Sequence, residues 1–192
     1  MSNLFYTGVG SREITHEEWD LMVAVAKWLA NCGFTLRSGN ANGSDSAFET
    51  GVEESKNKTL KEIYIPWEKF EGNDIPGEKI VLAKPDSMNY AISLQWIKEI
   101  HPAFDKLKQG ARKLHQRNVH QVLGQDLEHP IPSLFLLACS KEDKKGDVMG
   151  GTRTAWLIAK ANNVPCFNLR GKTKEELYAF LKPLVKGAIS GN

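Results

Sequence analysis

Apolar residues along this chain alternate between short runs and longer stripes with a helical repeat. The first run, at positions 4–9, is followed by a stripe over positions 19–30 in which apolar residues recur three or four residues apart. A short run followed by such a stripe predicts a strand and then an amphipathic helix. Thr15 and Glu18 have the spacing of a capping box, and Gly33 is typical of a helix end, so the helix is expected between them.

The same pattern recurs to the end of the chain. The run at 132–139 is the most apolar of all, which is typical of a central strand buried on both faces. Thr173 and Glu176 form a second capping-box pattern before the last helix. The other strands are expected at positions 34–37, 63–65, 80–82 and 164–167.

The middle of the chain is less regular. Positions 68–86 are rich in Gly, Pro and charge and predict a long excursion, and excursions of this length are commonly lids or ligand covers. Two helical stretches follow, separated by Pro102, with the apolar residues from Phe104 to Leu114 expected on one face of the second.

Strands that alternate with helices predict an α/β fold, because parallel neighbours need a crossover connection. We expect one Rossmann-like domain over residues 1–192, with a doubly wound, mainly parallel sheet and helices on both faces. Ligands of such sheets bind beyond the carboxyl ends of the strands. Three turns at that edge are rich in Gly, Ser, Thr and Asn, which is the main functional signal of the sequence.

Composition narrows the classes of function. The chain has 25 Lys and Arg against 23 Asp and Glu and is 41% apolar, which excludes a polycationic nucleic-acid coat and a disordered segment. There is no apolar stretch of membrane-spanning length and no signal-peptide pattern, so we expect a cytoplasmic protein without a membrane partner. Cys32, Cys139 and Cys166 form no CxxC pair and are expected to be reduced core residues. Neither a metal nor a cofactor is predicted.

The first turn contains Gly8, Gly10, Ser11 and Arg12. In the dinucleotide-binding fingerprint GxGxxG, the position of the third glycine is taken here by Glu13. Its carboxylate would crowd a pyrophosphate, so an ordinary dinucleotide site is disfavoured. The turn either supplies bare backbone, a hydroxyl and a cation to an anion, or is a tight turn with a solvated arginine.

The second turn runs from Ser38 to Asp45 and includes Gly39 and Asn42. Its amides and hydroxyls would donate to phosphate oxygens at a helix start, and Asp45 would cap the helix or accept from a ribose hydroxyl or a base amino group. A structural turn with a helix cap explains the same composition.

The third turn contains Gly150, Gly151, Thr152 and Arg153. Thr152 stands where a Walker loop requires lysine, which excludes a P-loop ATPase. A Gly-Gly-Thr step onto a helix N-terminus directs amide donors and a hydroxyl at an anion, so we favour a phosphate site here.

Positions 98–125 carry six basic residues against two acidic ones, and such a run is usually a solvated helix face. Arg117 and Asn118 stand where that face ends, and are expected on the rim of the pocket, within reach of phosphate or base. Trp67, at the mouth of the long excursion, would stack on a base or belong to the core or a hydrophobic lid.

Four short motifs follow one another in order: Gly10-Ser11-Arg12, Ser38-Gly39-x-Ala41-x-Gly43-x-Asp45, Arg117-Asn118 and Gly151-Thr152-x-Thr154-Ala155. In this order they resemble the Rossmann-like core of DNA-processing protein A (DprA) and of the wider SLOG superfamily, over about positions 1–170. The resemblance implies a phosphate-binding pocket at the strand ends, which the family uses for single-stranded DNA, nucleotides or nucleotide-derived signals. It makes a homo-oligomer plausible as well.

The same superfamily includes the LOG phosphoribohydrolases, whose PGGxGTxxE motif ends in a glutamate. This chain has no carboxylate in the turn after Gly151 and Thr152, and breaking an N-glycosidic bond needs an acid or base at the leaving group. The sequence therefore favours non-catalytic binding of a phosphate-bearing nucleotide or nucleotide-derived signal, which the protein would sense or sequester. The alternatives are single-stranded DNA binding and nucleotide N-glycosidase activity.

Overall fold

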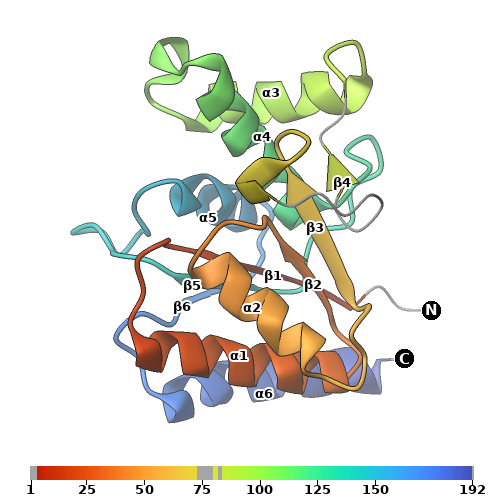
Figure 1. Ribbon diagram of the computed structural model, residues 1–192, viewed down its shortest axis with the longest axis vertical. Coiled ribbons are helices and arrows are strands. Elements are labelled where there is room, and N and C mark those ends of the chain that lie inside the picture. Colours follow the sequence, from red (N-terminus) through yellow and green to blue (C-terminus); the bar gives the residue numbers. More distant parts are fainter. Residues whose placement is uncertain (1–3, 73–79, 82–83, 192) are drawn as a thin grey trace.

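The computed structural model describes residues 4–72, 80–81 and 84–191 (Figure 1). Helices and strands alternate through most of this part of the chain. In order, the elements are β1 (Phe5–Gly10), α1 (His16–Asn31), β2 (Thr35–Ser38), α2 (Ser44–Glu53), β3 (Lys61–Ile65), η1 (Phe70–Gly72), β4 (Ile80–Val81), α3 (Met88–Ile100), η2 (Phe104–Lys106), α4 (Gln109–Leu123), β5 (Leu136–Cys139), α5 (Thr152–Ala161), β6 (Cys166–Asn168) and α6 (Lys174–Ser190).

Within the described residues, six strands form one parallel sheet in the order β4-β3-β2-β1-β5-β6. Strand β1 lies between β2 and β5, with Tyr6 opposite Leu36 and Gly8 opposite Leu137. From β1 the chain winds outward to β4 and then returns to the other side as β5. The strand order therefore reverses between β1 and β5, where open α/β sheets form a crevice. The predicted doubly wound, Rossmann-like architecture is confirmed.

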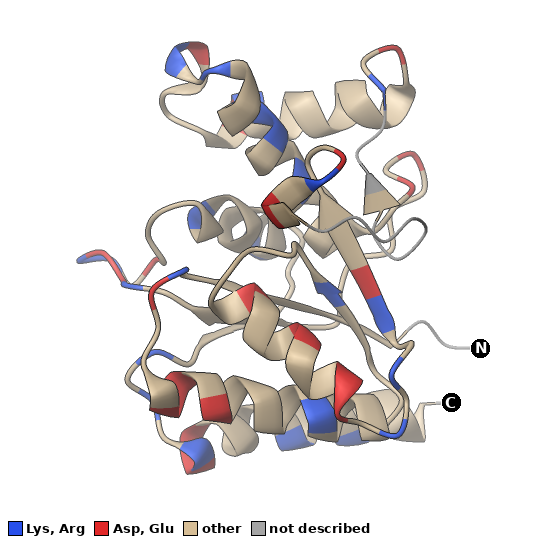
Figure 2. Cartoon of the chain, viewed as in Figure 1, with Lys and Arg blue, Asp and Glu red and all other residues tan. Residues whose placement is uncertain are grey.

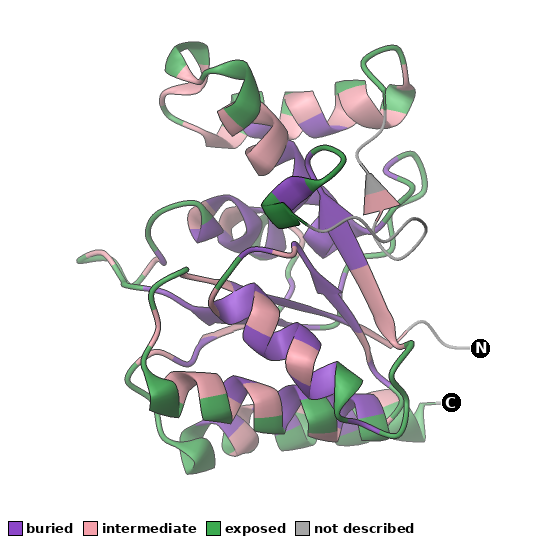
Figure 3. Cartoon of the chain, viewed as in Figure 1, coloured by how far each residue is buried: buried purple, intermediate pink, exposed green. Residues whose placement is uncertain are grey.

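Helices cover both faces of the sheet, and strand residues alternate between two hydrophobic clusters. Leu137 and Cys139 of β5 pack in the cluster that contains α1, α2 and α6. Leu136 and Ala138 face the other cluster, with α3, α4 and α5. All four residues of β5 are buried, which confirms the prediction of a central strand (Figure 3). Because successive side chains of β5 point to opposite faces of the sheet, this strand contributes to both hydrophobic cores.

Helix ends follow local side-chain chemistry. Thr15 and Glu18 form a complete capping box at α1, and Thr173 and Glu176 form another at α6, as predicted. The expected helix face that begins at Phe104 is wrong, because α4 begins only at Gln109. Phe104 lies in the short 3-10 turn η2 instead, and the residue after that turn is extended.

Three further expectations concern cysteines, the excursion and the membrane. Cys139 is buried as predicted, whereas Cys32 and Cys166 are only partly buried, and all three are free thiols. Of the excursion at 68–86, the structure describes η1, β4 and residues 84–86, while positions 73–79 and 82–83 lie outside the described residues. No helix in the described part of the chain has the length and apolar character needed to cross a membrane.

Candidate functional site

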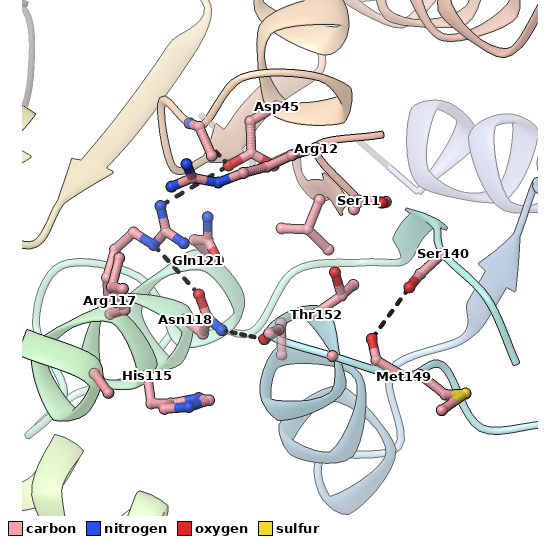
Figure 4. Close-up of a pocket in the computed structure, with 18 residues that line it drawn as sticks. Ser11, Arg12, Asp45, His115, Arg117, Asn118, Gln121, Ser140, Met149 and Thr152 are labelled. Atoms are coloured by element: carbon pink, nitrogen blue, oxygen red, sulfur yellow. Dashed lines mark hydrogen bonds and ion pairs between the residues drawn. The ribbon is translucent and has the colours of Figure 1, made fainter. Parts of the chain in front are cut away.

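A cavity of about 330 Å³ lies beyond the carboxyl ends of β1 and β5 (Figure 4). Three turns and one helix face form its walls. The β1–α1 turn contributes positions 9–12, and the β2–α2 turn contributes Ala41 and Asp45. One face of α4 and the turn from β5 to α5 complete the wall. The cavity thus occupies the crevice that the strand order creates.

The β1–α1 turn is fixed by its backbone. A side chain at Gly10 would collide with the Ser44 hydroxyl group and the Cys139 carbonyl oxygen, so only glycine fits. The Ser11 amide donates to that carbonyl at 2.7 Å, and the Ser11 carbonyl oxygen accepts from the Ser44 amide at 3.0 Å. The next side chain is free to reach outward: Arg12 is 57% exposed and pairs with Glu71 at 2.7 Å.

Asp45 brings a buried carboxylate to the cavity from the first turn of α2. Only 3% of the residue is exposed, and its Oδ2 accepts from the Ala41 amide at 3.3 Å. Burial raises the pKa of Asp45 to about 6, and the nearby Arg117 guanidinium, 3.9 Å away, opposes this shift. At neutral pH the carboxylate is therefore mostly ionised and acts as a hydrogen-bond acceptor.

Arg117 and Asn118 connect two of the turns across the cavity. The Nη1 atom of Arg117 donates to the Gly39 carbonyl oxygen at 2.6 Å, and its Nε donates to Asn118 Oδ1 at 3.2 Å. The Asn118 amide group in turn donates to the Gly151 carbonyl oxygen at 2.7 Å. Burial lowers the pKa of Arg117, opposed by Asp45. Both side chains are buried, so their expected position on the rim is corrected to the inner wall.

The N-terminus of α5 faces the cavity from the opposite side. Helix α5 begins at Thr152, and no side chain of the described residues caps its first turn. A side chain added at Gly150 or Gly151 would meet open space, so a ligand can approach the backbone there. The Arg153 amide donates to the Gly150 carbonyl oxygen at 3.2 Å, and the positive end of the helix dipole favours an anion at this end.

Nine further lining residues were not among the predicted site residues, and two of them, His115 and Gln121, bear polar side chains on α4. His115 lies 2.7 Å from the Thr154 hydroxyl oxygen, and burial, with smaller effects of His101 and Arg117, lowers the pKa of His115 to about 4. It is therefore neutral at pH 7. Gln121 is 1% exposed, and neither its Nε2 nor its Oε1 has a partner among the described residues. His115 lies three residues before Asn118, and Gln121 lies four residues after Arg117, so both share a face of α4 with a predicted site residue, and this spacing could have identified them.

The structure gathers most of the sequence-predicted site residues around this cavity. It is lined by Gly10, Ser11, Arg12, Asp45, Arg117, Asn118, Gly150, Gly151 and Thr152. Each of the three turns therefore contributes to one site.

Five predicted residues lie outside the lining. The Ser38 hydroxyl group donates to the Gly8 carbonyl oxygen at 2.7 Å, and Gly39 supports the wall through its contact with Arg117. Asn42 donates to Glu71 at 3.1 Å. Trp67 is 38% exposed and packs edge-on against Phe70. Arg153 pairs with Asp143 at 2.9 Å and with Asp147 at 3.6 Å, so it fixes the preceding loop.

No family model and no curated protein matches this sequence. Among solved structures, the chain is similar to DNA processing protein A from Helicobacter pylori, a structure described for its single-stranded DNA binding mode. The TM-score is 0.52 at 14% sequence identity, and the match covers 97% of this chain and 74% of that one. A likeness at this identity shows a shared fold, namely the DprA-like arrangement of the sheet and its helices.

Proposed function

We propose that this protein binds single-stranded DNA and holds one nucleotide unit of the strand in the cavity. The observation that carries the proposal is the difference between the two ends of the cavity: the N-terminus of α5 lies at one end, and the buried carboxylate of Asp45, beside Arg117 and Arg12, lies at the other. The fold shared with DNA processing protein A, whose structure was described for single-stranded DNA binding, supports DNA as the molecule that brings the nucleotide.

The α5 end suits a phosphate group. Gly150, Gly151 and Thr152 line the cavity there, and a side chain at either glycine would meet open space, so a ligand can approach the backbone. Backbone amides at a helix N-terminus bind phosphate. Arg12 lies at the other end of the cavity, beside Asp45 and Arg117, and pairs with Glu71 (Figure 4).

The Asp45 end offers an acceptor together with donors. The carboxylate of Asp45 would accept from a base amino group, or from a sugar hydroxyl of a free nucleotide. Arg117 and Arg12 stand beside it and bear donors (Figure 4). A nucleotide unit has this same polarity, with its phosphate at one end and hydrogen-bonding base edges at the other.

A DNA strand also needs contacts outside the cavity. Lys106, Lys108 and Lys113 lie on α4 and the segment before it, and the first two are exposed. Figure 2 shows this basic segment at the end of the molecule away from α1 and α6. The cavity-lining residues Ala111 and Leu114 belong to the same segment, so a strand leaving the cavity would pass these lysines.

A free nucleotide or nucleotide-derived signal is the second candidate. The observation that favours it is the volume of about 330 Å³, which lies at the lower end of ligand pockets and accepts one nucleotide-sized molecule. The two candidates share the cavity and differ in whether phosphates outside it are contacted.

Salt dependence of binding separates the two. Each phosphate of a single strand that the protein neutralises adds about 0.7 to the slope of log Kd against log salt concentration. We expect a fluorescent oligonucleotide to bind with a slope of about 2 to 3. Combined reversal of Lys106, Lys108 and Lys113 to Glu should lower that slope to about 1 or below.

The matched control is combined reversal of Lys172, Lys182 and Lys186 to Glu at the α6 end, which changes the net charge equally. This control should leave the slope of log Kd against log salt concentration for the oligonucleotide nearly unchanged. An oligonucleotide slope near 1 in the unmodified protein, equal to that for a mononucleotide, would decide for the free nucleotide. Failure of both probes to bind would reject the proposal.

A further inference from the structure

A carboxylate from η1 is bound to the cation at the Asp45 end of the cavity. Oε1 of Glu71 lies 2.7 Å from a guanidinium nitrogen of Arg12, and its Oε2 accepts from the Asn42 side-chain amide at 3.1 Å. Two donors from different turns thus converge on one anionic group. Because Arg12 lines the cavity, Glu71 neutralises a cation that the site would otherwise offer to an anionic ligand.

The backbone of η1 adopts an unusual conformation around this carboxylate. Lys69 has a φ of 60° and Glu71 a φ of 55°, in the left-handed region that residues other than glycine seldom adopt. Such conformations persist where surrounding contacts maintain them. Here the Asn40 side-chain amide donates to the Phe70 carbonyl oxygen at 3.2 Å, and the Phe70 ring lies 5.8 Å from the Arg117 guanidinium carbon. Contacts with the cavity wall therefore hold the Glu71 carboxylate in place.

We infer that Glu71 occupies the place of a phosphate group and competes with the DNA strand for Arg12. The inference rests on the proposed function, because it takes a single strand as the ligand. The α5 end of the cavity suits one phosphate, and Arg12 lies at the other end, so the competing group is a second phosphate of the strand (Figure 4). Its oxygens can accept from the Arg12 guanidinium and the Asn42 amide, as the carboxylate does.

The charges at this end show why the carboxylate and a phosphate exclude each other. Burial lowers the pKa of Arg117. The charge of Arg12 lowers this pKa further, and the charges of Asp45 and Glu71 raise it. Glu71 thus offsets the repulsion between two neighbouring guanidinium groups, which a bound phosphate would do equally well. Both anions together would repel each other at one cation.

A phosphate can displace Glu71 because the ion pair is weak. The Arg12 side chain is 57% exposed, and ion pairs of exposed side chains contribute little to stability. Arginine forms strong, charge-assisted hydrogen bonds with phosphate. The carboxylate therefore lowers the affinity for the strand without preventing its binding, and a protein that lacks this carboxylate should bind more tightly.

Removal of the Glu71 charge in the full chain tests the inference. Glu71→Gln keeps the shape of the side chain, and we expect it to strengthen binding of a fluorescent single-stranded oligonucleotide by about threefold to tenfold at low salt. Glu71→Gly should strengthen binding to a similar extent. Because glycine adopts the left-handed φ readily, this second variant keeps the local backbone conformation favourable.

Glu68→Gln is the matched control. Glu68 is an exposed glutamate just before η1 and lies outside the cavity lining, and its substitution changes the net charge equally. It should alter the affinity for the oligonucleotide by about twofold at most, because exposed charges away from the bound strand are screened.

Arg12→Gln distinguishes competition from repulsion at a distance. In the Arg12→Gln background, Glu71→Gln frees no cation and should strengthen binding no more than Glu68→Gln does. A gain that persists without Arg12 would mean that Glu71 acts on the strand by repulsion alone, and would overturn the inference.

The remaining outcomes separate this inference from the proposed function. Unchanged or weaker binding of the oligonucleotide by both Glu71→Gln and Glu71→Gly overturns the competition and leaves DNA binding intact. Binding by neither the unmodified protein nor any variant, at a salt concentration low enough to favour any strand, rejects the proposed function and the inference with it.

Discussion

The β2–α2 turn and the β5–α5 turn are both rich in glycine and both reach the cavity, but their glycines meet different surroundings. At Gly43, with φ of 86°, an added side chain would collide with the carbonyl oxygens of Ser11 and Arg12. At Gly151 it would meet nothing. The first turn uses glycine to let chain segments pack against one another, while the second leaves its backbone accessible.

The charged residues of the two turns differ in the same way. Asp45 is buried with a raised pKa, whereas hydrogen bonding by Lys160 lowers the pKa of Asp147 near the surface. Arg117 is buried and fixed to the Gly39 carbonyl oxygen, whereas Arg153 is partly exposed and paired with aspartates of its own loop. The β2–α2 turn therefore forms a rigid wall, and the β5–α5 turn presents open donors.

The sharpest test of this difference compares one alanine substitution in each turn. Gly43→Ala should lower the free energy of unfolding by about 3 kcal/mol or more, because the obstructing atoms are backbone and the left-handed φ is unfavourable for alanine. Gly151→Ala, at φ of −60° in open space, should cost about 1 kcal/mol or less. Urea unfolding of both variants measures the difference.

Equal losses in the two variants would contradict the comparison. A small loss for Gly43→Ala would mean that the β1–α1 and β2–α2 turns can separate without cost. In that case the wall of the cavity is adaptable, and its shape does not determine which ligand enters.

Much of the fold could be predicted because its signals are local. The capping boxes at Thr15 and Thr173 and the apolar strand at β5 need only neighbouring residues, and each was found at its expected place. The start of α4 was missed because Phe104 and Leu107 continue the apolar pattern, while the backbone after Leu107 is extended. Periodicity does not distinguish a helix from an apolar turn that precedes it.

The site was harder to predict than the fold, because its distinctions depend on contacts between distant segments. Nothing near Gly39 in the sequence indicates that Arg117 and Gln121 fill the space beside it. Likewise, Arg153 follows two glycines and a threonine as a phosphate ligand would, yet its partners come from a loop that folds back onto it. Composition of a turn thus identified where a site forms, and not which side chains face it.

A second test uses the opposite pKa shifts of the two aspartates. The folded-state pKa of Asp45, about 6, lies above its unfolded value of 3.8, so its contribution to stability is complete below about pH 4 and is lost as the pH rises through 6. The free energy of unfolding of Asp45→Asn, relative to the unmodified protein, should therefore increase from pH 4 to pH 7 by up to about 3 kcal/mol.

Asp147→Asn should show the opposite sign. The pKa of Asp147 is lowered in the folded protein, so the ionised group contributes stability above the unfolded pKa, and this is lost as the pH falls. Relative to the unmodified protein, Asp147→Asn should become less stable from pH 4 to pH 7. Parallel urea titrations at the two pH values measure both variants, and the same sign for both would refute the assignment of Asp45 as a carboxylate destabilised by burial and of Asp147 as one stabilised by its partners.

The smallest expected effect separates two adjacent residues of the open turn. Thr152 lines the cavity, whereas Arg153 is paired with Asp143 and Asp147 outside it. Thr152→Val keeps the shape of the side chain and removes a single hydroxyl donor, so it should weaken oligonucleotide or nucleotide binding by about tenfold, or roughly 1.4 kcal/mol. Arg153→Ala breaks surface ion pairs worth about 0 to 1 kcal/mol of stability and should change the affinity by about twofold at most. Calorimetric titration measures both. A larger loss of affinity for Arg153→Ala than for Thr152→Val would mean that the arginine leaves its aspartates to contact the ligand, and the β5–α5 turn would then be a moving part of the site.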